Sequence, residues 1–169
     1  MNIFLVRIKH FYSTISKRGD ILDKKCRYKP YHGAGVLFWC KNEHDSSISI
    51  LLGKRLYNPL KGKWSVPGGG YEREDGFISK KFNYRATAMR ESYEEIDVKA
   101  DLNDKAAFFK CHLFFFNWEL FDCEVKEKFY PRHYNEFSQL KWFSTNELPK
   151  NIPLLLKIQI AKLESILKR

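Results

Sequence analysis

The apolar and polar positions along the chain follow two patterns, one typical of strands and one typical of helices. Segments 33–40 and 48–56 are short and almost continuously apolar, as buried strands are. Segment 64–66 predicts a third, shorter strand that ends at a proline and three glycines. The aromatic run 108–120 and the shorter run 139–143 predict two more strands.

Residues 83–96 instead repeat apolar side chains at intervals of three and four, which predicts a helix. The expected packing stripe consists of Phe82, Ala86, Met89, Tyr93 and Ile96. Because successive helical residues turn by about 100°, Glu91, Glu94 and Glu95 are expected on the opposite side. The helix would then pack by one flank and present three carboxylates on the other.

A last helix is expected after Pro153, which would occupy its first position, where proline is tolerated. Its packing residues are expected to be Leu155, Ile158, Leu163 and Ile166. No repeat, low-complexity linker or boundary interrupts the 169 residues, so we expect a single domain over 1–169.

Lysine and arginine outnumber the acids by 30 to 20, which gives a net charge of +10. Such an excess serves solubility, or attracts a partner that carries phosphate. No apolar run is long enough to span a bilayer. The four cysteines include no C-x-x-C pair, so we expect a cytoplasmic protein without a zinc site. We interpret the basic segment 1–19 as an edge strand or arm, with organelle import as a second interpretation.

The carboxylates of segment 90–98 lie shortly after the glycines of segment 68–70. Such a cluster is usually a solvated acidic face that tolerates a small repulsion. A divalent ion would use its geometry, because Glu91 and Glu95 are four residues apart and Mg²⁺ prefers hard oxygen ligands. Glycine also lets backbone approach an ion or phosphate closely. We therefore predict a Mg²⁺ platform, with Mn²⁺ as the alternative ion.

At these residues the chain resembles the Nudix hydrolase family, also called MutT-like. The resemblance rests on W-x-x-P-G-G, Gly69, an acid six residues later, and Arg-Glu-x-x-Glu-Glu at 90–95. Asp75 stands where the family has its first glutamate, with Glu72 and Glu74 as alternatives for that position. Segment 76–85 carries a seven-residue insertion. Two further departures are Ser92 for an apolar residue and Asp97 for the closing glycine.

The resemblance implies an α/β fold, a three-layer α/β/α sandwich with a mixed sheet. It implies that Glu91 and Glu95 bind the metal, with Glu94 a ligand or close neighbour and the carbonyl of Gly68 completing the set. Arg90 would orient the carboxylates, and Glu95 or Glu136 would accept the proton of the attacking water. The remaining candidates would contact substrate: Arg55, because its strand should lead toward the site, and Gly69 and Gly70.

The function implied is Mg²⁺-dependent hydrolysis of a diphosphate linkage in a nucleotide or nucleoside diphosphate derivative. Nucleotide sugars, dinucleotides, nucleoside triphosphates and capped RNA 5′ ends are all candidates. The expected partner is therefore a nucleotide or nucleotide-linked small molecule, or an RNA 5′ end, with no membrane and with a monomer or homodimer as the assembly. The alternative is a non-catalytic nucleotide- or RNA-binding module on the same fold.

Overall fold

The computed structural model describes residues 30–42, 47–102, 105–132 and 134–168, so the N-terminal arm considered above lies outside the described residues. The elements in chain order are β1 (Tyr31–Lys41), β2 (Ile48–Arg55), β3 (Trp64–Ser65), β4 (Gly68–Gly70), the 3₁₀ turn η1 (Arg73–Asp75), β5 (Phe77–Ile78), β6 (Lys81–Phe82), α2 (Tyr84–Ile96), β7 (Phe109–His112), β8 (Phe116–Glu124), β9 (Phe137–Ser144) and α3 (Leu154–Leu167).

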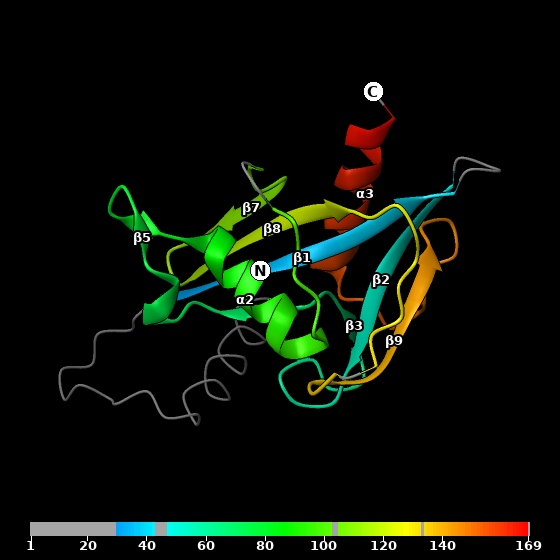
Figure 1. Cartoon of the computed structure of the whole chain (residues 1–169), viewed down its shortest axis with the longest axis horizontal. Coiled ribbons are helices and arrows are strands. Elements are labelled where there is room, and N and C mark those ends of the chain that lie inside the picture. Colours follow the sequence, from blue (N-terminus) through cyan, green and yellow to red (C-terminus); the bar gives the residue numbers. More distant parts are fainter. Residues whose placement is uncertain (1–29, 43–46, 103–104, 133, 169) are drawn as a thin grey trace, which may run out of the picture.

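Strand β1 is the centre of a mixed sheet (Figure 1). Along one edge it pairs in parallel with β8, from Tyr31 opposite Phe116 to Trp39 opposite Glu124. Along the other edge it pairs antiparallel with β4 and then with β2. Strand β2 continues the sheet through antiparallel pairing with β9 and β3, and β7 extends the opposite side through β8. The sheet is therefore mixed, as expected.

Helices cover both faces of this sheet, so the molecule has three layers (Figure 1). Alternate residues of β1 point to opposite faces. Val36 and Phe38 pack on the side of α2, whereas Leu37 packs with Leu156 and Ile160 of α3. This arrangement confirms the α/β/α sandwich. Within the described residues, no helix is both long enough and apolar enough to cross a membrane.

Two segments contain more strands than the sequence predicted. The run 108–120 is a hairpin, in which β7 and β8 are joined by a turn closed by hydrogen bonds between Leu113 and Phe116. Its aromatic residues carry a strong strand preference, which hides the turn from a pattern of hydrophobicity alone. The glycines at 68–70 were expected to follow the end of a strand, but they form a strand of their own, β4, against β1. An added Cβ at Gly68 would lie 2.5 Å from the Ala34 carbonyl oxygen, so the backbones meet too closely for a side chain.

The predicted packing stripe of α2 is wrong in part. Ile96 is buried, but Met89 and Tyr93 are exposed, and the buried positions are instead Thr87, Ala88, Ser92, Glu95 and Ile96. Small residues occupy the contact because the helix lies close to the glycine-rich strands. Glu95 consequently lies on the packed side of α2 rather than on its outer face.

The prediction for the last helix is also wrong in part. Pro153 precedes α3 as its N-cap residue instead of occupying its first position. The buried face consists of Leu156, Gln159, Ile160 and Leu163. Only Leu163 was predicted correctly, while Leu155, Ile158 and Ile166 are exposed. The helix has apolar residues on more than one face, so periodicity alone could not select the packed one.

Candidate active site

The carboxylate of Glu95 and the backbone of β4 meet where α2 crosses the sheet. The Gly68 N–H donates a hydrogen bond to Glu95 Oε2 at 2.8 Å. One turn earlier, Glu91 lies directly over Gly69, where an added Cβ would come within 2.5 Å of Glu91 Oε2. Glu91 and Glu95 therefore face the same glycine strand, β4, which also contains Gly68, the predicted backbone ligand.

Replacing Gly69 with alanine is expected to displace the carboxylate of Glu91 without unfolding the protein. The added Cβ would meet only the flexible end of that side chain, and the backbone at residue 69 is not left-handed. We expect Mn²⁺ or Mg²⁺ affinity to fall by about 10–100-fold, as for other changes next to a metal ligand. Calorimetric titration measures this affinity.

The matched control is Gly70→Ala, because the nearest atom to its added Cβ lies 3.6 Å away. Its metal affinity should stay within about threefold of the original, since the disturbance of a metal ligand is what weakens binding. Equal losses of affinity in both variants would contradict the assignment of Glu91 to the metal.

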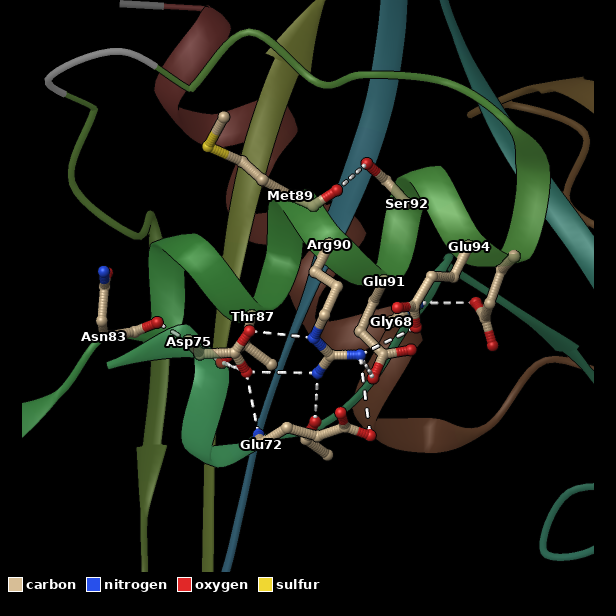
Figure 2. A network of polar contacts seen from close by, with 12 residues as sticks. Gly68, Glu72, Asp75, Asn83, Thr87, Met89, Arg90, Glu91, Ser92 and Glu94 are labelled. Carbon is tan, nitrogen blue, oxygen red and sulfur yellow. Dashed lines mark hydrogen bonds and ion pairs between the residues drawn. The ribbon is translucent and has the colours of Figure 1, made fainter. Parts of the chain in front are cut away.

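The guanidinium of Arg90 organises the acidic residues around it (Figure 2). Its Nε donates to Asp75 Oδ1 at 2.8 Å and its Nη2 to Asp75 Oδ2 at 3.1 Å. Nη2 also donates to the Gly70 carbonyl at 2.7 Å, while Nη1 bonds Glu91 at 3.0 Å and Glu94 at 2.8 Å. Arg90 thus ties η1, β4 and α2 together.

Of the candidates for the first acidic position of the motif, Asp75 pairs with Arg90 at 2.8 Å, whereas Glu72 lies 4.0 Å from it. Asp75 is buried beneath Arg90 and also accepts hydrogen bonds from the Thr87 hydroxyl at 2.8 Å and the Glu72 N–H at 2.9 Å. Burial alone would raise the pKa of Asp75, but the hydrogen bonds from Arg90, Glu72 and Thr87 and the charge of Arg90 lower it below its ordinary value. Thr87 was not singled out in the sequence, although a buried threonine inside a helix needs such a partner.

A second arginine connects the remaining acids. Arg55 Nη1 lies 2.9 Å from Glu95 Oε1, and its Nη2 lies 2.8 Å from Glu136 Oε2. The Asn135 N–H donates to the Glu95 carbonyl, so the loop before β9 is held against the end of α2. The structure therefore brings Arg55 and Glu136 to Glu95, from three separate elements of the chain.

Glu95 is buried and Glu91 is partly buried, and this raises the pKa of both carboxylates. Burial raises the pKa of Glu95 to about 8, although the charge of Arg55 and the Gly68 N–H oppose the shift. Burial likewise raises the pKa of Glu91 to about 7, against the opposing effect of Arg90. Glu94 differs, because its side chain is 55% exposed and turned toward Arg90. A positive ion near Glu91 and Glu95 would favour their charged forms.

The two departures at the end of the motif have structural explanations. Ser92 is fully buried and donates hydrogen bonds to the carbonyls of Met89 and Val98, which fastens the last turn of α2. Asp97 ends the helix with φ 56° and ψ 34°, the left-handed conformation that a glycine usually takes there. Neither change alters the residues that face β4.

The donor set fits a hard divalent cation, because the carboxylates of Glu91 and Glu95 face a glycine strand that has no side chains of its own. Among the described residues, however, no three acidic, histidine or cysteine side chains converge on one point suited to a metal ion. These carboxylates are instead paired with arginines: Arg90 pairs with Glu91 and Glu94, and Arg55 pairs with Glu95 and Glu136. Metal binding at Glu95 would exchange an arginine contact for a metal contact.

Comparison with known proteins identifies the class to which this fold and site belong. The sequence model of the NUDIX domain matches residues 31–163. A search of curated proteins gives no match to the chain. The chain belongs to the NUDIX domain family, and this confirms the predicted class, a Nudix-type hydrolase acting on phosphoric anhydride bonds.

Solved structures share this fold at low sequence identity. The Nudix hydrolase RenU from M. smegmatis is 14% identical, with a TM-score of 0.61 over 86% of this chain and 91% of that protein. The NUDIX domain of Shewanella oneidensis NrtR, crystallised with ADP-ribose, is 15% identical with a TM-score of 0.61 over 90% and 97%. A C. elegans Ap4A hydrolase is 16% identical with a TM-score of 0.53 over 80% and 98%. Against a MutT/nudix protein from Enterococcus faecalis the match spans only 49% of that chain.

Proposed function

We propose that the protein hydrolyses a diphosphate linkage in a nucleotide or nucleoside diphosphate derivative, with Mg²⁺ as its cofactor and Mn²⁺ as the alternative. The observation that carries the proposal is the position of Glu91 and Glu95, a partly buried and a buried carboxylate set against the same glycine strand. The ADP-ribose and Ap4A named for two structural neighbours both contain phosphoric anhydride bonds attached to a nucleoside, which favours this substrate class. We further propose that residues 1–169 act as one hydrolase domain.

In this proposal Glu91 and Glu95 hold the metal, Glu94 stays a close neighbour, and the carbonyl of Gly68 is the backbone ligand. The bound ion supplies charge neutralisation on the phosphate oxygens and lowers the pKa of water. Arg90 fixes the carboxylates through the geometry described above. Arg55 is the residue placed to contact a phosphate, since its guanidinium lies beside Glu95. Gly69 and Gly70 let the substrate approach the backbone.

Glu136 is the stronger candidate for the general base, because Glu95 would be occupied by metal. Arg55 lies between Glu136 and Glu95 and pairs with both. The Glu136 side chain is 29% exposed, so water can reach its carboxylate. A carboxylate at this distance from the metal ligands can accept the proton of an attacking water. Glu95 remains the second candidate for that role.

The alternative function, a non-catalytic binding module, is favoured by one observation. Arg55 already neutralises Glu95 and Glu136, so these acids have a positive partner within the protein. A binding module would keep this pair and need no metal. The predictions of a cytoplasmic location and of a monomer or homodimer stay predictions.

A substrate panel tests the function directly. The protein is incubated with ADP-ribose, Ap4A, a nucleoside triphosphate, a nucleotide sugar and 5′-triphosphorylated RNA, with Mg²⁺ or with EDTA. We expect phosphate, pyrophosphate or nucleoside monophosphate release from at least one compound, reduced to background by EDTA because the metal supplies the activated water. Nucleotide binding without turnover of any compound would instead establish the binding module.

A further inference from the structure

The seven-residue insertion forms a separate two-stranded hairpin beside α2. Strands β5 and β6 pair Phe77 with Phe82 and Ile78 with Lys81. The turn between them places Ser79 and Lys80 at φ 50° and 65°. Two consecutive residues with positive φ make the tight turn that suits the twist of a hairpin. The insertion is therefore an ordered projection (Figure 1).

Aromatic contacts brace this hairpin against the sheet. The ring of Phe82 stacks on His32 with centroids 3.8 Å apart, and it meets Tyr71 edge-on at 4.6 Å. His32 Nδ1 is in turn hydrogen-bonded to the Tyr84 hydroxyl at 2.6 Å. Tyr71 also contacts Phe77, with centroids 5.7 Å apart. The hairpin is held by β1, α2 and the end of β4, so its outer residues have a fixed orientation.

The outer part of the hairpin combines apolar and basic side chains. Phe77 is 61% exposed and Ile78 is 56% exposed, although both are large hydrophobic residues. Lys80 and Lys81 are exposed beside them. Aromatic rings next to lysines are the features by which proteins bind single-stranded nucleic acid, since the rings stack on bases and the lysines neutralise phosphates.

The charge of the molecule supports the same ligand. The chain carries a net charge of +10, and the hairpin itself, residues 77–82, has lysines but no acid. Three acids precede the hairpin in the η1 region. Glu72 lies 4.0 Å from Arg90, Asp75 is paired with Arg90, and Glu74 is exposed next to the exposed Arg73. A polyanion would therefore meet positive charge at the hairpin.

The position of the hairpin determines how long such a ligand must be. It joins α2 at Asn83, and Glu91 lies eight residues further along the helix, which is about 12 Å. Stacked nucleotides repeat every ~3.4 Å along a strand, so a ligand spanning both points needs a few nucleotides.

We propose that the β5–β6 hairpin is a binding platform for single-stranded RNA, which stacks a base on Phe77 and places phosphates near Lys80 and Lys81. The RNA would run from its 5′ phosphoric anhydride at Glu91 and Glu95 to the hairpin. This path rests on the proposed function, because that function places the anhydride at the two glutamates. The platform itself does not depend on catalysis.

The first experiment measures RNA binding where no hydrolysis occurs. Fluorescence anisotropy is recorded with a labelled single-stranded RNA 8-mer that ends in a 5′ hydroxyl, in EDTA. Compared with the unmodified protein, Phe77→Ala/Lys80→Glu is expected to raise the Kd at least 10-fold and to lower the dependence on salt. The matched control is Lys157→Glu/Ile158→Ser on α3, which lies on the opposite face of the sheet. Ile158 is 50% exposed there, so the control also removes an exposed apolar side chain and reverses one charge. This control should change the Kd less than threefold.

The second experiment compares substrates of different length. In the unmodified protein, kcat/KM should be higher for a 5′-triphosphorylated 8-mer than for the mononucleotide. In Phe77→Ala/Lys80→Glu this preference for length should disappear, while the α3 control retains it. Thermal unfolding of each variant confirms that the hairpin change leaves the rest of the fold intact.

The outcomes separate this inference from the proposed function. RNA binding that depends on the hairpin, without turnover of any substrate, would support the platform and reject the hydrolase. Turnover with equal RNA affinity in the hairpin variant and the control would reject the platform alone. Absence of RNA binding together with a concentration-dependent dimer that the hairpin change dissolves would also reject it, and would assign the surface to a second copy of the chain.

Discussion

Glu95→Gln is expected to lower kcat/KM by roughly 10²–10⁴-fold, a loss typical of removing a charged group that acts in proton transfer or metal binding. The side chain is 4% exposed and faces the Gly68 N–H, so its negative charge is placed where a cation and the phosphate oxygens would meet. Glutamine keeps the size and the hydrogen-bond acceptor but not the charge. Steady-state kinetics on the substrate found in the panel measures the loss.

Glu94→Gln is the matched control for Glu95→Gln. Glu94 belongs to the same motif, but its carboxylate is 55% exposed and points toward Arg90. We therefore expect a smaller loss of kcat/KM, about tenfold. Similar losses in the two variants would show that the motif acts through its total charge, and that the burial of Glu95 has no special role.

Glu95→Gln should not destabilise the fold, so a loss of activity in this variant would not result from unfolding. The pKa of Glu95 in the folded protein is about 8, above its ordinary value of 4.5, because burial disfavours the charged form. The folded state therefore holds a proton that the unfolded state has lost, and stability falls as pH rises from 4.5 to 8. Without metal at pH 8 and above, Glu95→Gln should unfold at the same or a higher urea concentration than the unmodified protein.

The protein class could be predicted from the sequence because the residues that identify it lie close together in one short motif. Arg90, Glu91 and Glu95 stand at spacings set by one helix, and their contacts with Asp75 and β4 follow from that spacing. The layered fold was also predicted. Its sheet was identified strand by strand wherever an apolar run was long and bounded by polar residues, as in β1 and β2.

The packed faces of the helices could not be predicted, for a physical reason. In α2 the contact with the sheet is so close that small or polar residues such as Ala88 and Ser92 fill it, while Met89 and Tyr93 remain outside. A search for large apolar residues therefore selects the wrong flank. The positions of Arg55 and Glu136 beside Glu95 likewise depend on strand pairing between β2 and β9, which involves residues far apart in the chain.

Arg90→Met is expected to lower the free energy of unfolding by roughly 3–5 kcal/mol, the usual effect of leaving one member of a buried ion pair without its partner. Asp75 has a side chain that is only 2% exposed, and Arg90 supplies two of its hydrogen bonds. Methionine preserves much of the packing but leaves a buried carboxylate with only the Thr87 hydroxyl and the Glu72 N–H. Urea unfolding at pH 7 measures the change.

Two comparisons identify the uncompensated charge as the cause. Arg85→Met removes the same group from the same helix, where it donates to the Lys105 carbonyl, and should lower the free energy of unfolding by less than Arg90→Met does. The double variant Arg90→Met/Asp75→Asn should be more stable than the sum of the single changes predicts, because it no longer buries a lone charge.

The pH dependence gives an independent test of this pair. The pKa of Asp75 is lowered in the folded protein, so its contribution to stability is fully present above 3.8 and is lost as pH falls through the lowered value. In Arg90→Met, burial without the arginine raises the pKa of Asp75, so the buried carboxylate takes up a proton as pH falls. The difference in unfolding free energy between the unmodified protein and Arg90→Met should therefore be largest near pH 7 and become smaller toward pH 3. A difference that stays the same down to pH 3 would mean that Arg90 stabilises the fold by packing, and that its charge on Asp75 contributes little.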